Sequence, residues 1–168
     1  MKKLTVLLLP LALLAMSCGT NGTAANVPAA QVAVGDGDFS DVMDRYWILS
    51  EIRTAYETVT LDRDNHAALG FGDIFTLRFE GGMVFGTAMP NTYRGPYTLG
   101  ENQSLTFGLM ATTMMAAFME PEELTEHQFF VHLGNVVKWG LADGNLELYT
   151  LDQYNEEVVL LFVPLGND

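Results

Sequence analysis

Apolar and polar residues alternate along most of the chain after residue 45, with the period of two that is typical of strands buried on one face. β-branched and aromatic residues are frequent in these stretches, and glycine, asparagine or aspartate stands between many of them. The pattern predicts strands at residues 46–52, 56–61, 74–79, 83–87, 95–99, 104–107, 136–141, 146–151 and 158–164.

Short polar turns connect three pairs of these strands. Gly81 and Gly82 supply the positive φ that a tight hairpin needs, and residues 100–102 and 142–145 have a similar turn composition. Because hairpins join antiparallel neighbours, we expect an α+β, mostly β fold with an antiparallel, barrel-like sheet of about eight strands. Residues 62–72 are expected to form a polar loop.

One substantial helix is predicted in this β-rich chain, at residues 120–134. Pro121 suits a helix start, acidic residues fill the first turn where the helix dipole favours them, and Gly134 suits the end. A shorter helical turn is expected at residues 40–44, with Ser40 as its cap.

Residues 1–17 have the features of a signal peptide. Lys2 and Lys3 precede an apolar run at residues 4–16, which is too short for a permanent membrane-spanning helix. Cys18, the only cysteine, stands where a bacterial lipoprotein signal places its acylated residue. We therefore expect export and anchoring on a membrane of the bacterial cell envelope by acyl chains such as palmitate at Cys18. The alternative is cleavage by a general signal peptidase, which would release a soluble secreted protein.

Residues 18–40 are expected to form the lipidated N-terminus and a flexible tether. They are rich in small and polar residues and contain no aromatic side chain before Phe39. Residues 41–168 then form the folded domain. Because the chain has no second cysteine, this domain has to be stable without a disulfide.

The charge balance excludes one class of partner. The chain has 21 acidic and 8 basic residues, a formal net charge of −13. Nucleic-acid binding needs a cluster of basic side chains, but those after the signal peptide are scattered singly along the sequence. They are Arg45, Arg53, Arg63, Arg78, Arg94 and Lys138. We expect no nucleic-acid partner, and no attraction to anionic lipid beyond that of the acyl anchor.

Motifs for metal binding and catalysis are weak. His127 and His132 are five residues apart, so their side chains diverge on a helix, whereas Glu123 and His127 share a face but lack a third ligand. Residues 62–73 resemble a calcium loop, yet Ala67 stands where that loop requires glycine. None of the serines after the signal peptide lies in a Gly-x-Ser-x-Gly motif, which would mark a nucleophile. We therefore expect a protein without a cofactor or bound metal that is not an enzyme.

Residues 109–119, which we call the methionine segment, contain four of the nine methionines. Methionine adapts its shape to irregular apolar surfaces, so the segment either lines an apolar groove or fills the core. The candidate groove residues are Met110, Met114, Met115, Phe118 and Met119.

Several short motifs occur along the chain in a defined order. They are Trp47-Ile48-Leu49, then Asn91, Tyr93, Gly95 and Tyr97, then Thr113-Met114-Met115-Ala116, then Glu126, Phe129 and Leu133, and last Leu146-Glu147-Leu148. In this order they resemble the META domain family of HslJ-type, heat-inducible bacterial lipoproteins. The resemblance covers residues 47–163. The chain departs from the family at Met89-Pro90 and Ala117, where members often have cysteine. A thiol role is therefore excluded here.

The resemblance implies a barrel-like sheet flanked by a helix, on an envelope lipoprotein with no established catalytic activity. Two hypotheses follow: a non-enzymatic protein that binds a partner or supports envelope integrity under stress, or a carrier of lipid or another apolar ligand in a sheet-lined cavity. Trp47 and Trp139 are expected in the core because each lies mid-strand. The motif residues Trp47, Asn91, Tyr93, Gly95, Thr113 and Met115 are expected to serve structure.

Overall fold

A computed structural model of the protein describes residues 37–117 and 119–166. The predicted signal peptide, Cys18, the tether up to residue 36, and Phe118 lie outside the described residues. The fold considered below belongs to the compact unit of residues 33–168. Of the helices in the described ranges, none has both the length and the apolar character needed to cross a membrane.

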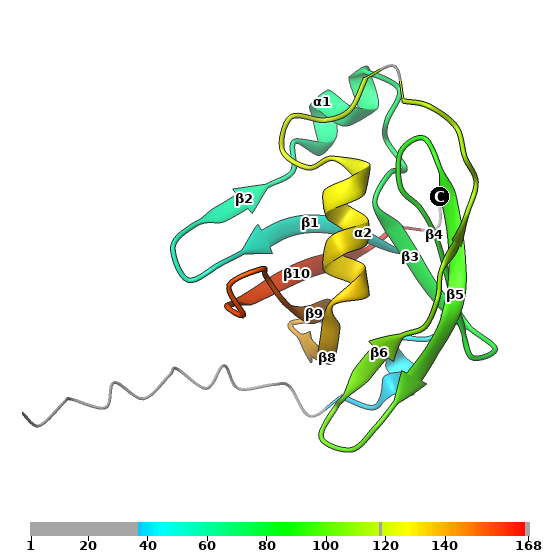
Figure 1. The fold of residues 1–168 in the computed structure, drawn as a ribbon, viewed down its shortest axis with the longest axis vertical. Coiled ribbons are helices and arrows are strands. Elements are labelled where there is room, and N and C mark those ends of the chain that lie inside the picture. Colours follow the sequence, from blue (N-terminus) through cyan, green and yellow to red (C-terminus); the bar gives the residue numbers. More distant parts are fainter. Residues whose placement is uncertain (1–36, 118, 167–168) are drawn as a thin grey trace, which may run out of the picture. The chain divides into compact units, whose positions relative to one another are not determined.

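The described chain forms an antiparallel sheet of ten strands (Figure 1). Eight of them follow the order β6-β5-β4-β3-β1-β10-β9-β8, with β2 beside β1 and β7 beside β5. A bridge between Ser104 and Lys138 joins the β6 and β8 ends, so the sheet is nearly closed. The predicted mostly β, barrel-like fold is confirmed. The strands are β1 (Trp47–Arg53), β2 (Thr58–Thr60), β3 (Thr76–Glu80), β4 (Met83–Thr87), β5 (Thr92–Leu99), β6 (Leu105–Phe107), β7 (Ala111–Thr112), β8 (Val136–Ala142), β9 (Asn145–Leu151) and β10 (Glu157–Pro164).

The main helix, α2 (Glu126–Gly134), starts later than predicted. Its cap is Thr125, whose side chain accepts a hydrogen bond from the Gln128 backbone while the Gln128 side chain accepts one from the Thr125 backbone. This capping box outcompetes Pro121 as the start signal, so the predicted start at residue 120 is wrong. The predicted end at Gly134 is confirmed.

Two short helical segments correct further predictions. Residues 62–72 were expected to be a loop but contain α1 (Arg63–Ala68), with Asp62 as its cap. The 3-10 helix η1 (Phe39–Asp41) is capped by Asp38 rather than by Ser40. Phe39 lies within the range expected for the tether, yet its ring is buried in the core. Burial of this large aromatic side chain in the core is more favourable than its exposure to water as part of a tether.

Aromatic and aliphatic side chains fill the interior of the sheet. Trp47 and Trp139 are both buried, as expected, at 0% and 5% exposure. Phe39 contacts the rings of Phe79 and Trp139 edge to face, with centroids 5.1 and 4.9 Å apart. Helix α2 lies in front of the sheet in Figure 1, and its Phe129 ring lies 5.0 Å from that of Phe75. The interior is therefore a packed core.

Candidate functional site

Asn91 fixes the start of β5, helix α2 and the methionine segment to one another. It is buried, and its amide nitrogen donates to Glu126 Oε2 at 2.8 Å and to the Met115 carbonyl at 3.1 Å. Its amide oxygen accepts from the Met115 backbone at 2.7 Å and from Thr113 Oγ1 at 2.9 Å. The Asn91 backbone also donates to Glu126 Oε1 at 3.0 Å. Every donor and acceptor of the amide is thus used within the protein.

The methionine segment runs along the outside of the sheet. Its strand β7 pairs with β5, and Thr113 and Thr92 exchange two hydrogen bonds of 3.1 Å. Met110 packs against the core, whereas Leu109 and Met114 are more than nine-tenths exposed, at 93% and 97%, and Met115 and Met119 are also exposed. The core interpretation is therefore wrong for these four exposed side chains.

Two of the candidate groove residues line separate hollows in the described part of the chain. Met110 lines a hollow of about 340 Å³ together with Leu109 and Phe130. Met119 lines a different hollow of about 560 Å³, beside His66. Met114 and Met115 line neither hollow, and Phe118 lies outside the described residues.

The other motif residues have structural contacts. Tyr93 is buried, and its hydroxyl donates to the Thr76 carbonyl at 2.8 Å; burial raises the pKa of that hydroxyl. A Cβ atom at Gly95 would lie 3.0 Å from the Met110 side chain and 3.2 Å from the Leu109 carbonyl. Glycine at this position therefore lets the methionine segment lie close against β5. Trp47 donates from its indole to the Val42 carbonyl at 2.9 Å.

Glu123 pairs with His66 instead of sharing a helix face with His127. Because α2 begins only at residue 126, Glu123 belongs to the preceding loop, and its Oε2 lies 3.3 Å from Nε2 of the buried His66. A hydrogen bond from its own backbone, and then one from His66, lower the pKa of the Glu123 carboxyl against the opposing effect of burial. The pair joins α1 to the loop before α2.

The loop that resembled a calcium site has a structural role. The Asp62 side chain accepts a 3.0 Å hydrogen bond from the Asn65 backbone, and Arg63 donates to the carbonyls of Leu49 and Ile74. Burial lowers the pKa of Arg63 to about 10, although the nearby Glu123 charge opposes the shift. Within residues 37–117 and 119–166, no three His, Cys, Asp or Glu side chains are arranged to hold a metal ion.

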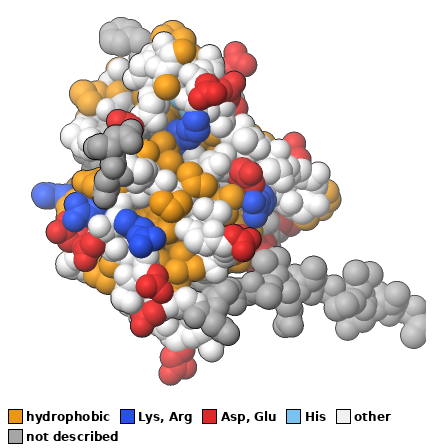
Figure 2. Space-filling model, turned by 180° about the vertical axis from the view of Figure 1, so that it is seen from behind, with side chains coloured by type: hydrophobic (Ala, Val, Ile, Leu, Met, Phe, Trp, Pro, Cys, Tyr) orange, Lys and Arg blue, Asp and Glu red, His pale blue; other side chains and the backbone are white. Residues whose placement is uncertain are grey.

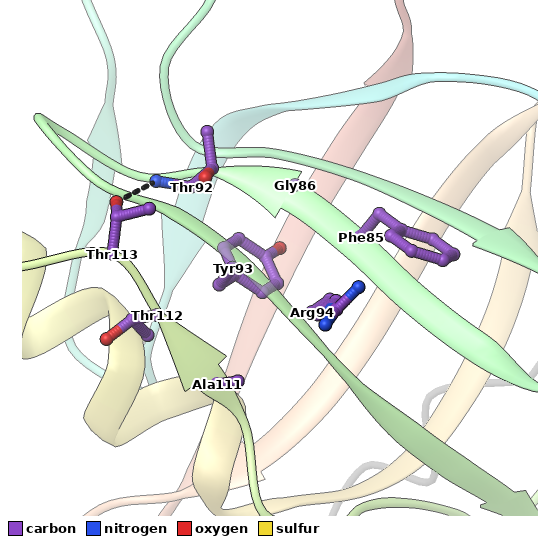
Figure 3. Close-up of a pocket in the computed structure, with 8 residues that line it drawn as sticks. All are labelled: Phe85, Gly86, Thr92, Tyr93, Arg94, Ala111, Thr112 and Thr113. Carbon is purple, nitrogen blue, oxygen red and sulfur yellow. Dashed lines mark hydrogen bonds between the residues drawn. The ribbon is translucent and has the colours of Figure 1, made fainter.

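A further hollow of about 510 Å³ lies over β4, β5 and β7 (Figure 3). Figure 3 shows Phe85 and Arg94 on neighbouring strands, with Thr92 and Thr113 at the other end of the hollow. The lining residues are Phe85, Gly86, Thr92, Tyr93, Arg94, Ala111, Thr112 and Thr113. Neither Phe85 nor Arg94 was predicted from the sequence to be a site residue. The hairpin signal at Gly81 and Gly82, read together with the alternation of β5, could have placed them side by side.

Comparisons with known proteins agree with this architecture. The family model described as META domain matches residues 40–164. A protein from Burkholderia xenovorans solved by NMR has a similar structure, with a TM-score of 0.55 and 20% identity, over 75% of this chain and 85% of that one. A DUF4847 family protein from Bacteroides vulgatus has a TM-score of 0.51 and 13% identity, over 79% of this chain and 100% of that one. No curated protein matches the sequence. At these identities, the two structures show a common fold only.

Proposed function

The chain belongs to the META domain family, and from this premise we propose that it is a non-enzymatic binding protein of the bacterial cell envelope. In this proposal the methionine segment is the surface that contacts a partner protein. The resemblance to heat-inducible lipoproteins supports a role in envelope integrity under stress. The observation that carries the proposal is the exposure of large apolar side chains on a segment whose backbone is held in place.

Exposure of the methionine segment favours binding over packing. Burying a methionine side chain gains about 1.5 to 3 kcal/mol, and Met114 and Met115 leave much of that gain unused in the isolated chain. Apolar side chains that gather on a surface typically mark an interaction site, and methionine fits partners of varied shape. Because Asn91 and Thr92 already hold the backbone, a partner would have little chain to order on binding.

Membrane anchoring is the second part of the proposal. It is supported by the apolar run at residues 4–16 and by the single cysteine, Cys18, that follows it. Acyl chains at Cys18 would hold the mature protein on a membrane, and the chain between Cys18 and the folded domain would give the domain reach from that surface.

The proposal that the protein is not an enzyme has two supports. The serines after the signal peptide lie outside any nucleophile motif. In the described part of the chain, two buried groups with a clearly shifted pKa also have structural partners: Tyr93 bonds the Thr76 carbonyl, and Arg63 bonds two backbone carbonyls. Groups used in this way hold the fold together and are not free to exchange protons with a substrate.

Site-specific photo-crosslinking in intact cells tests the partner surface. A photoreactive residue is placed in turn at Met114, at Met115 and, as a control, at Tyr154, whose side chain is 75% exposed on another loop. We expect one discrete crosslinked product from the first two positions and none from Tyr154. The purified partner should then bind the mature chain at least about tenfold more weakly after Met114→Ser with Met115→Ser. Equal crosslinking from all three positions, or no product from any, would refute the proposal.

An apolar-ligand carrier is a second candidate, favoured by the hollow of about 340 Å³ beside Met110, Leu109 and Phe130. Native mass spectrometry of the protein purified from membranes separates the two functions. Under the carrier hypothesis, a lipid-sized adduct remains bound and is lost in Met110→Ser. Under the partner hypothesis, the mass is that of the acylated mature chain without a further adduct.

A further inference from the structure

Arg78, Phe85 and Arg94 form a row across three strands of the sheet. Arg78 is the register partner of Phe85 between β3 and β4, and Phe85 is the register partner of Arg94 between β4 and β5. Side chains of such partners lie on the same face, about 5 Å apart at their Cβ atoms. The adjacent residues Phe79 and Val84 are buried, so the row lies on the outer face of the barrel.

The charge of Arg78 is already compensated within the protein. Its guanidinium lies over the Tyr46 ring, 5.1 Å from the centroid, and donates to the Tyr46 hydroxyl at 3.3 Å. A second nitrogen lies 3.2 Å from Glu80 Oε2. Arg78 is therefore held in position at one end of the row.

Arg94, in contrast, is exposed and makes no side-chain hydrogen bond or ion pair within residues 37–117 and 119–166. Its register partner on β7 is the small residue Ala111, which leaves space beside it. This space is the hollow of about 510 Å³ in Figure 3, with the Phe85 ring on one side and Thr92 and Thr113 on the other. An uncompensated guanidinium beside an open hollow is notable in a chain of net charge −13.

The surface around the row combines charge with apolar area. Figure 2, the view from behind, shows basic side chains, with acidic ones beside them, on the side of the molecule where β3, β4 and β5 lie, next to apolar surface. Phe85 contributes to that apolar surface, since 37% of its side chain is exposed. A planar guanidinium pairs with a carboxylate through two parallel hydrogen bonds, and an aromatic ring stacks on a flat apolar group.

We propose that this hollow is a binding site for a carboxylate close to an aromatic ring in the same ligand, with Arg94 pairing the carboxylate and Phe85 contacting the ring. Arg94 attracts the negative charge of a small acid. A polyanion is less favoured, because the acidic remainder of the protein repels an extended negative chain. The carboxylate could belong to a free aromatic acid or to an acidic residue next to an aromatic one in a peptide. This site does not depend on a partner at the methionine segment.

NMR titration of the mature chain, residues 18–168 with Cys18→Ser, tests the proposal. The probes are benzoate, the neutral analogue benzamide, and the dipeptides acetyl-Phe-Asp-amide and acetyl-Phe-Asn-amide. We expect benzoate to shift the backbone amides of β4, β5 and β7 and to bind at least about tenfold more tightly than benzamide. Raising the salt concentration should weaken benzoate binding and leave benzamide binding unchanged.

Substitutions separate the role of the guanidinium from that of charge in general. Arg94→Gln should lower benzoate affinity at least about tenfold, to the level of benzamide, while Arg94→Lys should retain part of the affinity because it keeps the charge but not the planar fork. The matched control Lys138→Gln, which removes one positive charge on β8, should change affinity by less than about twofold. Phe85→Leu should weaken benzoate more than it weakens acetate.

The outcomes divide cleanly. Preference of the Asp dipeptide over the Asn dipeptide, with affinity above that of benzoate, supports the site and identifies a peptide as its source. Binding of benzoate without such a preference supports the site and identifies a free acid. Equal binding of benzoate and benzamide, shifts confined to other strands, or an unchanged affinity in Arg94→Gln with a native spectrum would overturn the proposal.

Discussion

Removing the Asn91 side chain should loosen the attachment of the methionine segment to the sheet. In Asn91→Ala, the Met115 backbone loses both an acceptor at 2.7 Å and a donor at 3.1 Å, and Thr113 Oγ1 loses its acceptor at 2.9 Å. Glu126 Oε2 loses the amide donor at 2.8 Å, although Oε1 keeps the Asn91 backbone donor. One substitution therefore breaks contacts to two other parts of the chain.

The magnitude follows from the number and kind of these hydrogen bonds. A neutral hydrogen bond contributes about 1 kcal/mol net, and one to a charged group about 1.5 to 3 kcal/mol. Three neutral bonds and one charged bond would together exceed about 4 kcal/mol if every partner stayed buried. Because the neighbouring Met115 is exposed, water can replace part of the loss. We therefore expect the free energy of unfolding to fall by about 2 to 4 kcal/mol.

Urea denaturation of the mature chain, followed by Trp fluorescence, measures this change. Asn91→Asp is expected to be at least as destabilising as Asn91→Ala, because it places a second carboxylate against Glu126. Asn65→Ala is the matched control: this residue is exposed on α1, and its substitution should change the free energy by less than about 0.5 kcal/mol. Limited proteolysis should cut the methionine segment faster in Asn91→Ala than in the wild type.

A loss smaller than about 0.5 kcal/mol would refute this reasoning, because it would mean that the hydrogen bonds contribute nothing that water cannot replace. Unchanged stability combined with lost partner binding would be a second contrary result. It would mean that Asn91 contacts the partner directly and does not serve to hold the segment.

Three further changes test other links. Cys18→Ser should release the protein from the membrane fraction while its circular dichroism spectrum stays unchanged, since the anchor and the core share no contact in the proposed arrangement; membrane retention of this variant would reveal another anchor. Trp47→Ala should lower the urea-derived free energy of unfolding by about 3 to 5 kcal/mol, because the side chain is fully buried and donates to the Val42 carbonyl; a loss below about 1 kcal/mol would contradict the core assignment. Glu123 has a folded pKa below its ordinary 4.5, so its stabilising contribution is present above that pH and is lost as pH falls through the folded value. The melting temperatures of the wild type and Glu123→Gln should therefore differ at pH 7 and converge as the pH falls below 4.5, and a constant difference would exclude the hydrogen-bonded carboxylate.

The sequence by itself determined the elements that depend on local chemistry. The strand at residues 83–87 was predicted with its observed bounds because its alternation is regular and Gly81 and Gly82 define the preceding turn. The turn at Asp143 and Gly144 was predicted in the same way, from its turn-forming residues. In the structure both residues have positive φ, at 54° and 79°. Interactions between residues a few positions apart produce such sequence patterns, so these elements can be predicted without knowledge of the fold.

Where the sequence contains competing signals for the start of a helix, only the tertiary structure decides between them. Pro121 and Thr125 are both acceptable helix starts, and the observed start at Thr125 leaves Glu123 free to reach His66, 57 positions earlier in the chain. The polar composition of residues 62–72 likewise hid α1, whose buried His66 lies 3.3 Å from this distant carboxylate. Long-range pairing of this kind leaves no trace in local periodicity.

Tertiary structure alone decided which surfaces carry candidate function. An apolar run such as residues 109–119 reads equally well as core or as surface, and its exposure results from the anchoring of its backbone on the outside of β5 by Asn91. Arg78 and Arg94 are scattered along the sequence, yet two strand pairings bring them into one row around Phe85. Neighbours in a sheet are set by register across several strands, a property of the whole fold that no single segment of the sequence contains.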